Sequence, residues 1–402
     1  MARIIIHIDL NSCFATCEQQ DNPKWRNKPL GVVQDSGKRS VIIASSIEAK
    51  VLGIGTGHKV WEAQQKCPEI ILVPARFDKY VDYARKFRKV CKEYSYLVEV
   101  FSIDELFIDA TKTAHVFGGV KKIAYLIKKR LREEVGDYLK CSVGVAPNKM
   151  LAKLASGSEK PDGLVIVPEK NKLDFLDKHL IWHICGIGHR LEKRFNKLGV
   201  FTIKQLRQIP VKKLKEKFGI MGQVYADWAN GIDHSLVLPS GETPPDKSYG
   251  NQLTLANNVD EKEAKSVILW LCWQVASRMR KHKMGGKTVS LYVRRKDKSA
   301  YAQKSTSFVC FSAWDIYRLS IHILDKKLNW KGQVRFVGVS ISNLIPLSPA
   351  TLPALSKDLK WLKLSQAWDG LSEKYSPFFV RPASLVDMDL KKTEFNGFTK
   401  KF

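Results

Sequence analysis

The chain has 402 residues, 44% of them hydrophobic and 27% charged, and its 67 Lys and Arg exceed its 40 Asp and Glu to give a formal net charge of +27. These proportions indicate a soluble globular protein of two to four structural units. No apolar run approaches the ~20 residues of a membrane-spanning helix, so we do not expect such a helix. The cationic excess favours a polyanionic partner.

The eight cysteines form no Cys-x-x-Cys pair, and most of them lie among apolar neighbours. They therefore indicate buried free thiols in a reducing compartment. Residues 1–20 carry acidic side chains and lack a cleavage pattern for a signal peptide. We expect a cytoplasmic monomer with no membrane partner.

The first part of the chain predicts strands and helices in a split βαβ order. A buried strand opens it, and a hairpin follows a long amphipathic helix, as in the ferredoxin-like arrangement of an antiparallel sheet covered by helices. The predicted strands are Ile4–Ile8, Leu30–Val33, Ser40–Ala44, Val98–Ile103, Leu106–Asp109 and Cys141–Val145, and the predicted helices are Cys13–Gln20, Ile47–Leu52, Lys79–Tyr94, Val120–Glu134 and Asn148–Ser156.

The pattern changes after Pro161-Asp162-Gly163 to short helices between 172 and 230. Residues 232–247 contain three prolines and several polar residues, which predicts an extended linker. Strands and helices resume over 248–345, with a helix over Glu261–His282 and strands over Lys287–Arg294 and Gln333–Ser342. A helical patch over Leu359–Lys374 precedes a mixed polar tail.

Three carboxylates stand where strands end or bend. Asp9 closes the first apolar run, and Asp104 and Glu105 lie between two apolar stretches. If these strands are neighbours in one sheet, the carboxylates converge, and like charges so close need a cation such as Mg²⁺. The alternative is that Asp9 caps the next helix and that Asp104 and Glu105 are ordinary turn residues. The basic clusters described next favour the metal site.

Lys and Arg gather in two places. There are ten of them against two acidic residues from Ile181 to Gly219, and ten against one from Arg278 to Lys304. In the first cluster, a turn over Gly186, Ile187 and Gly188 resembles a helix-hairpin-helix that grips a phosphate backbone, although a plain helix end with a C-cap is the alternative. In the second, a strand leads into a basic run that can lie along DNA, although a solvated sheet face is the alternative. The candidate DNA-binding residues are Gly186, Ile187, Gly188, Arg190, Lys193, Arg194, Arg294 and Arg295.

These residues resemble the Y family of DNA polymerases, the translesion class. The similarity covers about residues 1–345. It rests on the first acidic segment Ile6–Ala15, on Ser102-Ile103-Asp104-Glu105, on the block Ser142–Lys153 and on Lys160–Gly163. The resemblance implies an error-prone, template-directed polymerase that adds dNTPs to a primer past damaged bases, without proofreading.

The resemblance also implies roles for single residues. Two Mg²⁺ ions would be held by Asp9, Asp104, Glu105 and the carbonyl oxygen of Leu10. Phe14 would be the steric gate that rejects a 2′-hydroxyl, and Lys50 and Lys160 would contact the triphosphate. The family usually carries Tyr and Arg in the segment that reads Ser46–Lys50 here; Ile47 cannot donate a hydrogen bond, and Lys50 cannot form a bidentate pair.

The resemblance implies an α+β right hand with a ferredoxin-like palm. The expected parts are a palm at 1–19 and 78–166, fingers at 20–77, a helix-hairpin-helix thumb at 167–231, a linker at 232–247, an α/β little finger at 248–345 and a tail at 346–402. In the family a C-terminal peptide often binds the sliding clamp. Here Leu390–Phe402 has three Phe but no clear glutamine-led motif, so clamp binding stays open.

Two other functions are compatible with parts of this pattern. A nucleotide cyclase also uses a ferredoxin-like sheet with paired carboxylates and two metals, but it does not need the Gly186–Gly188 turn or the basic second half. A DNA-binding protein without enzymatic activity explains the charge but not the three carboxylates. Primer extension with Mg²⁺ and dNTPs separates these functions.

Overall fold

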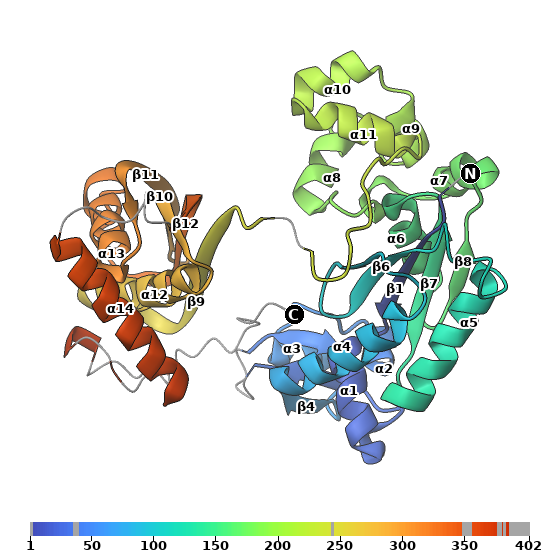
Figure 1. Cartoon of the computed structure of the whole chain (residues 1–402), viewed down its shortest axis with the longest axis horizontal. Helices are drawn as coiled ribbons and strands as arrows, with labels where there is room; N and C mark the ends of the chain where they lie inside the picture. Colours follow the sequence, from blue (N-terminus) through green and yellow to red (C-terminus); the bar gives the residue numbers. More distant parts are fainter. Residues whose placement is uncertain are drawn as a thin grey trace. The chain divides into compact units, whose positions relative to one another are not determined.

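The computed structural model describes residues 3–34, 40–242, 245–347, 356–375, 380 and 383–385. The chain divides into two compact units near residue 243, and each unit is described by itself (Figure 1). Within the described residues, no helix combines the length and the apolar character that crossing a membrane requires.

The first unit is built on a five-stranded sheet in the order β5 (Val98–Val100), β6 (Glu105–Asp109), β1 (Ile5–Leu10), β7 (Cys141–Ala146) and β8 (Leu164–Ile166). Strand β1 is antiparallel to both β6 and β7, and only β8 runs parallel to its neighbour. The order of the first four strands is the ferredoxin-like arrangement predicted from the sequence. The α+β fold is therefore confirmed.

Helices cover both faces of this sheet because the strands are apolar on both sides. Helices α4 (Phe77–Lys92) and α5 (Val120–Arg130) pack on the face that carries Ile6 and Ile8. Helix α6 (Lys149–Ser158) packs on the opposite face, which carries Ile5. Helix α5 continues as a π-helical turn over Leu131–Val135.

A small second sheet has the order β3 (Ile42–Ser45), β2 (Leu30–Val33) and β4 (Ile71–Pro74). Strand β4, which runs parallel to β2, was not expected from the sequence. Three helices accompany this sheet: α1 (Cys13–Asp21), α2 (Ile47–Val51) and α3 (Val60–Lys66).

The short helices predicted after residue 172 are present. They pack around the buried side chains of Phe195, Ile203 and Leu214. These helices are α7 (Lys172–Asp177), α8 (His189–Asn196), α9 (Ile203–Arg207), α10 (Val211–Phe218) and α11 (Met221–Ala229). Short 3-10 turns lie beside them at Glu169–Asn171 and Ile181–His183, and elsewhere in the chain at Pro23–Trp25 and Ala383–Leu385.

The segment after α11 has no helix or strand over the described residues 232–242 and 245–247, and its first part is hydrogen-bonded to the first unit. The Met150 amide donates to Asp233 Oδ2 at 3.0 Å, and the Leu238 amide donates to Glu99 Oε2 at 3.0 Å. Residues 233–238 therefore have a defined path along the first unit.

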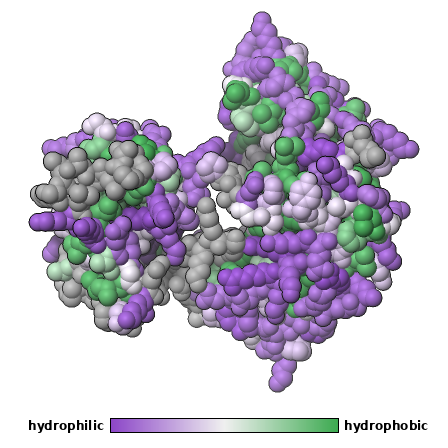
Figure 2. All heavy atoms as spheres, in the orientation of Figure 1, coloured by the Kyte–Doolittle hydropathy of each residue, from purple (hydrophilic) through white to green (hydrophobic). Residues whose placement is uncertain are grey.

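The second unit has a four-stranded antiparallel sheet in the order β11 (Ser299–Cys310), β10 (Met284–Arg294), β12 (Val334–Pro346) and β9 (Ser248–Val259). Its core joins this sheet to α12 (Glu261–Lys281) and α13 (Ala313–His322). A π-helical turn at Ile323–Lys327 follows α13, and α14 spans Ser356–Lys374. Hydrophilic residues dominate the visible surface of each unit (Figure 2).

Candidate active site

The three predicted carboxylates lie at one end of the first sheet. Asp9 of β1 is directly opposite Glu105 of β6, and Asp104 immediately precedes β6. The Leu10 amide donates to the Asp104 carbonyl at 2.9 Å, which ties the hairpin to β1. Glu105 is therefore the first residue of a strand rather than part of the bend. Two like charges directly opposite each other in a sheet destabilise it, so this pairing is costly without a cation.

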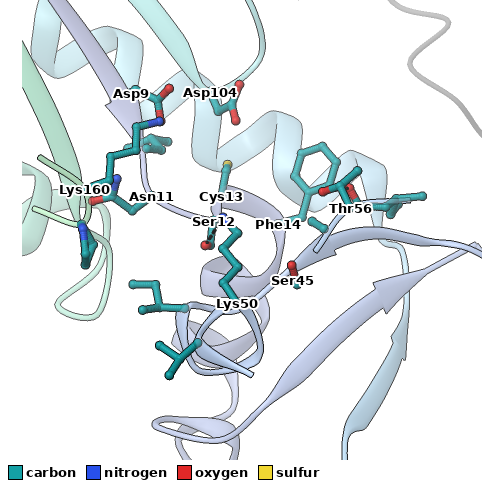
Figure 3. Close-up of a pocket in the computed structure, with 16 residues that line it drawn as sticks. Asp9, Asn11, Ser12, Cys13, Phe14, Ser45, Lys50, Thr56, Asp104 and Lys160 are labelled. Carbon is teal, nitrogen blue, oxygen red and sulfur yellow. Dashed lines mark hydrogen bonds and ion pairs between the residues drawn. The ribbon is translucent and has the colours of Figure 1, made fainter. Parts of the chain in front are cut away.

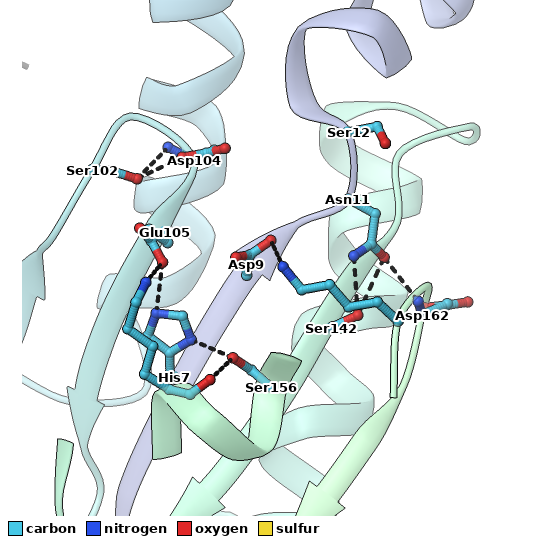
Figure 4. Close-up of polar contacts among 12 residues, drawn as sticks. His7, Asp9, Asn11, Ser12, Ser102, Asp104, Glu105, Ser142, Ser156 and Asp162 are labelled. Carbon is cyan, nitrogen blue, oxygen red and sulfur yellow. Dashed lines mark hydrogen bonds and ion pairs between the residues drawn. The ribbon is translucent and has the colours of Figure 1, made fainter. Parts of the chain in front are cut away.

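Each carboxylate is occupied by a protein group (Figure 4). The Lys160 Nζ lies 2.8 Å from Asp9 Oδ1, and the Ser102 hydroxyl donates to Asp104 Oδ1 at 2.5 Å. Glu105 forms an ion pair with Lys153. Among the residues that the structure describes, no three His, Cys, Asp or Glu side chains already converge as a metal site. Asp9 and Glu105 are thus each paired with the ammonium group of a lysine, which acts as a monovalent cation.

The ionisation of the carboxyl groups differs according to these partners. Burial raises the pKa of Asp104; the Ser102 hydrogen bond lowers it, and the charges of Asp9 and Glu105 raise it further. Burial would also raise the pKa of Glu105, but the hydrogen bonds from His7 and Lys153 bring it down to about 2. The negative charge of Asp104 is therefore less compensated by neighbouring groups than that of Glu105. A cation beside Asp104 would stabilise its ionised form.

An open cavity of about 510 Å³ lies beside these carboxylates (Figure 3). Asp9, Asp104 and Phe14 line it together with Lys50 and Lys160. The Lys50 Nζ donates to the Ser12 hydroxyl at 2.8 Å. The pKa of Lys50 is lowered by burial and by the charge of Lys160. Two cations that repel each other across one cavity favour a polyvalent anion between them.

A second cavity of about 490 Å³ shares Asp9 and Lys160 with the first. It extends along α6, where Lys153 lines it, and reaches Lys178 and His183. Asp9 therefore stands between two cavities, each lined by lysines.

Phe14 lies in α1 on the wall of the first cavity and is half-buried. Its ring stacks on Tyr80 with centroids 4.4 Å apart and planes 9° apart. The Tyr80 hydroxyl donates to the fully buried Glu18 at 2.7 Å. Burial raises the pKa of Tyr80 to about 12, so this hydroxyl stays a donor. The stacking fixes the plane of the Phe14 ring.

The loop that carries Lys160 is fastened from the end of β1. The Asp162 amide donates to Asn11 Oδ1 at 2.8 Å, and Asn11 Nδ2 donates to the Ser142 hydroxyl at 3.0 Å. The Asp162 carboxylate pairs with Lys128 at 3.0 Å and also binds Arg132. These contacts hold the backbone beside Lys160 in one position.

The candidate DNA-binding residues lie in both units. Gly186 has φ +101°, in the left-handed region that favours glycine, and Gly188 is the N-cap of α8. Ile187 is buried and anchors the turn. On α8, Arg190 and Lys193 are exposed, and Arg194 donates to the Lys217 carbonyl. In the second unit, the guanidinium of Arg294 lies over the ring of Phe336, and Arg295 forms an ion pair with Asp297.

Several residues of the site were not singled out from the sequence. His7 and Asn11 lie in or beside β1, and Lys153 and Ser156 lie on α6. Only His7 gives a local signal, because it is a polar residue inside an otherwise β-branched run. The contacts of the others depend on how α6 packs on the sheet, which no local pattern specifies.

Comparisons with known proteins identify related chains over nearly the whole length. Family models match at residues 8–157 (impB/mucB/samB family), 246–353 (impB/mucB/samB family C-terminal domain) and 183–233 (DNA polymerase-iota, thumb domain). DNA polymerase IV of Pelotomaculum thermopropionicum is 36% identical over 393 residues, which cover 95% of each chain. DNA polymerase IV 1 of Bacillus subtilis is 31% identical, covering 100% of this chain and 97% of the relative.

Solved structures agree with these relatives. A Y-family DNA polymerase chimera of Dbh and Dpo4 superposes with a TM-score of 0.72 and 26% identity, covering 85% of this chain and 99% of the other. An insertion ternary complex of Dbh DNA polymerase gives a TM-score of 0.59 with the same identity and coverage.

Proposed function

Because the chain belongs to the Y family of DNA polymerases and is a DNA-directed DNA polymerase of the translesion class, we propose that two Mg²⁺ ions are held by Asp9, Asp104, Glu105 and the Leu10 carbonyl. The observation that carries this proposal is the register of β1 and β6, which sets Asp9 directly opposite Glu105 with Asp104 beside them.

The residues present fit such ions. Mg²⁺ prefers carboxylate and carbonyl oxygens and leaves positions for phosphate oxygens and water. Asp9 and Glu105 already hold lysine ammonium groups, and Asp104 lies where its charge is poorly compensated. Bound Mg²⁺ would lower the pKa of the attacking hydroxyl and neutralise charge on the departing pyrophosphate.

The two cavities that share Asp9 provide room for the two reactants. The incoming nucleotide would occupy the first cavity, where Lys50 and Lys160 bind its triphosphate and Phe14 lies against its sugar. The primer 3′ end would occupy the second cavity, beside Lys153. Asp9 lies between them and would bring the reacting oxygen and the α-phosphate together.

Membership of the family also suggests which segments form the palm, fingers, thumb and little finger. We propose that the five-stranded sheet with α4, α5 and α6 is the palm (1–19 and 78–166) and that residues 20–77 with the small sheet are the fingers. Helices α7–α11 would form the thumb (167–231), and the second unit would contain the little finger (248–345). The segment Leu390–Phe402, considered for clamp binding, lies outside the described residues.

Primer extension tests the function directly. We expect the purified protein to extend a primer on a DNA template with Mg²⁺ and dNTPs, and to form no cyclic nucleotide from a nucleoside triphosphate alone. Binding of DNA without extension would contradict the enzymatic assignment. Formation of cyclic nucleotide without any requirement for DNA would favour the cyclase.

DNA affinity should depend strongly on salt because the two basic clusters would bind phosphates. Arg190→Ala should make the slope of log affinity against log salt less steep by about 0.9, the contribution of one phosphate contact on duplex DNA. Lys121→Ala is the matched control, because Lys121 is exposed on α5, outside both clusters. Equal slopes for wild type and Arg190→Ala, from titrations between low and moderate salt, would contradict the assigned role of α8.

A further inference from the structure

His7 is a polar side chain in the centre of the first sheet. It lies in β1 between Ile6 and Ile8 and is 0% exposed. Because side chains alternate along a strand, His7 is on the same face as Asp9 and as the residue opposite Asp9, Glu105. A buried polar group needs hydrogen-bond partners, and its partners belong to the proposed catalytic site.

Both ring nitrogens of His7 have close neighbours (Figure 4). The Nε2 atom lies 3.0 Å from Glu105 Oε2, and the Nδ1 atom lies 2.7 Å from the Ser156 hydroxyl. Lys153 also binds Oε2 of Glu105. His7 and Lys153 therefore contact the same oxygen of Glu105, Oε2, and the other oxygen, Oε1, is left for a metal ion.

Glycine at position 144 allows helix α6 to come this close. Gly144 of β7 pairs with His7, so no side chain stands between the ring and the helix. A Cβ atom at this position would lie 2.1 Å from the Ala152 carbonyl oxygen and 2.3 Å from the Ser156 nitrogen, both backbone atoms of α6. The close packing brings Ser156 to Nδ1, and Lys153 on the same helix to Glu105.

The contacts of His7 connect the carboxylate to the helix. The Ser156 hydroxyl donates to the Lys153 carbonyl at 2.9 Å and lies 2.7 Å from Nδ1, so it ties the His7 ring to the backbone of α6. An ionised carboxylate only accepts, so Nε2 is the group that can donate across its 3.0 Å contact with Glu105. This contact is close but is not aligned as a hydrogen bond in the structure.

We propose that His7 and Ser156 are positioning residues for catalysis: Ser156 holds the His7 ring against α6, and His7 holds Glu105 in the orientation that presents Oε1 to the metal. This inference rests on the proposed role of Glu105 as a metal ligand. Partners of this kind fix the orientation of a ligand, and their loss typically weakens metal binding or activity about 10- to 100-fold.

Four variants test this inference. His7→Leu removes both ring contacts at similar volume, whereas His7→Gln keeps a donor nitrogen at the position of Nε2. Ser156→Ala removes only the hydroxyl. Ile6→Val is the matched control for stability, because it trims the same strand on the opposite face. Mn²⁺ affinity is measured by electron paramagnetic resonance in the complex with dNTP and a dideoxy-terminated primer, in which no chemistry occurs.

We expect His7→Leu to weaken Mn²⁺ binding about ten-fold and to lower kcat by a similar factor, with little change in the KM for dNTP. His7→Gln should recover most of the affinity, and Ser156→Ala should lie between His7→Leu and wild type. Ile6→Val should lower the melting temperature without changing Mn²⁺ affinity. Wild-type affinity in His7→Leu, or equal losses in Ile6→Val and His7→Leu, would overturn the proposal.

Two further results keep the test decisive. If His7→Leu does not fold, wild-type Mn²⁺ affinity in Ser156→Ala would overturn the proposal, and a loss there that His7→Gln largely avoids would support it. Glu105→Gln separates the two proposals: unchanged Mn²⁺ affinity in this variant would contradict the role of Glu105 as a metal ligand. A loss in Glu105→Gln without a loss in His7→Leu would contradict only the positioning role.

Discussion

Asp104→Ala should slow primer extension by several orders of magnitude and leave DNA binding almost unchanged. Removing a ligand of the catalytic ions would cost about 4 kcal/mol of transition-state stabilisation, which is a rate loss of about 10³-fold at 1.36 kcal/mol per factor of ten. DNA affinity should persist because the basic side chains that would bind the backbone lie elsewhere. Single-turnover extension and a separate binding titration measure the two effects.

The stability of the same variant distinguishes loss of a ligand from misfolding. The folded-state pKa of Asp104 is raised, first by burial, so the folded state binds this proton more tightly than the unfolded chain does. Such a group destabilises the fold as pH rises through its folded-state pKa, so at neutral pH ionised Asp104 lowers stability. Without Mg²⁺, Asp104→Ala should therefore melt at the same temperature as wild type or higher.

A carboxylate at the other end of β6 provides the control. Asp109 accepts from the Thr111 amide at 2.9 Å, and it lies opposite Ile5, four residues from Asp9 along β1. Asp109→Asn keeps this acceptor and should extend primers at nearly the wild-type rate. Extension by Asp104→Ala at the rate of Asp109→Asn would refute the metal assignment.

The strand end at Asp9 and the hairpin at Asp104 could be predicted from the sequence, because each depends on residues that are neighbours along the chain. The β-branched run that ends at Asp9 predicted β1, and the apolar stretches around Asp104 predicted the hairpin. The pairing of Asp9 with Glu105 was not predicted, because the register between β1 and β6 depends on how distant segments pack.

The supporting contacts of the site were beyond local patterns for the same reason. Ser156 binds His7 across 149 positions of the chain, and Asp162 binds Asn11 across 151. Strand β4 was missed because Ile71–Pro74 is short and is completed only by parallel pairing with β2. The residue types around the site could be read from the sequence, whereas their partners could not.

Phe14→Ala should admit ribonucleotides. An apolar surface that meets a hydroxyl typically discriminates by about 100-fold, and we expect this factor to be lost when the ring is removed. The expected result is ribonucleotide incorporation that rises about 100-fold relative to deoxynucleotide incorporation, measured as the ratio of kcat/KM values for the two sugars. The discrimination requires the ring to stay in place, and its stacking on Tyr80 at 4.4 Å provides this.

The alternative is that Phe14 only packs, and Phe77 is the matched control for it. Phe77 lies edge-on to Phe14 at 6.2 Å and to Tyr80 at 6.1 Å, but it does not line the first cavity. Phe77→Ala should lower the melting temperature about as much as Phe14→Ala does, since each removes one ring from the same cluster, yet it should keep the wild-type preference for deoxynucleotides. If Phe14→Ala keeps that preference too, Phe14 is a packing residue. Sugar discrimination would then have to come from another part of the cavity wall, such as the backbone over Ile43–Ser45.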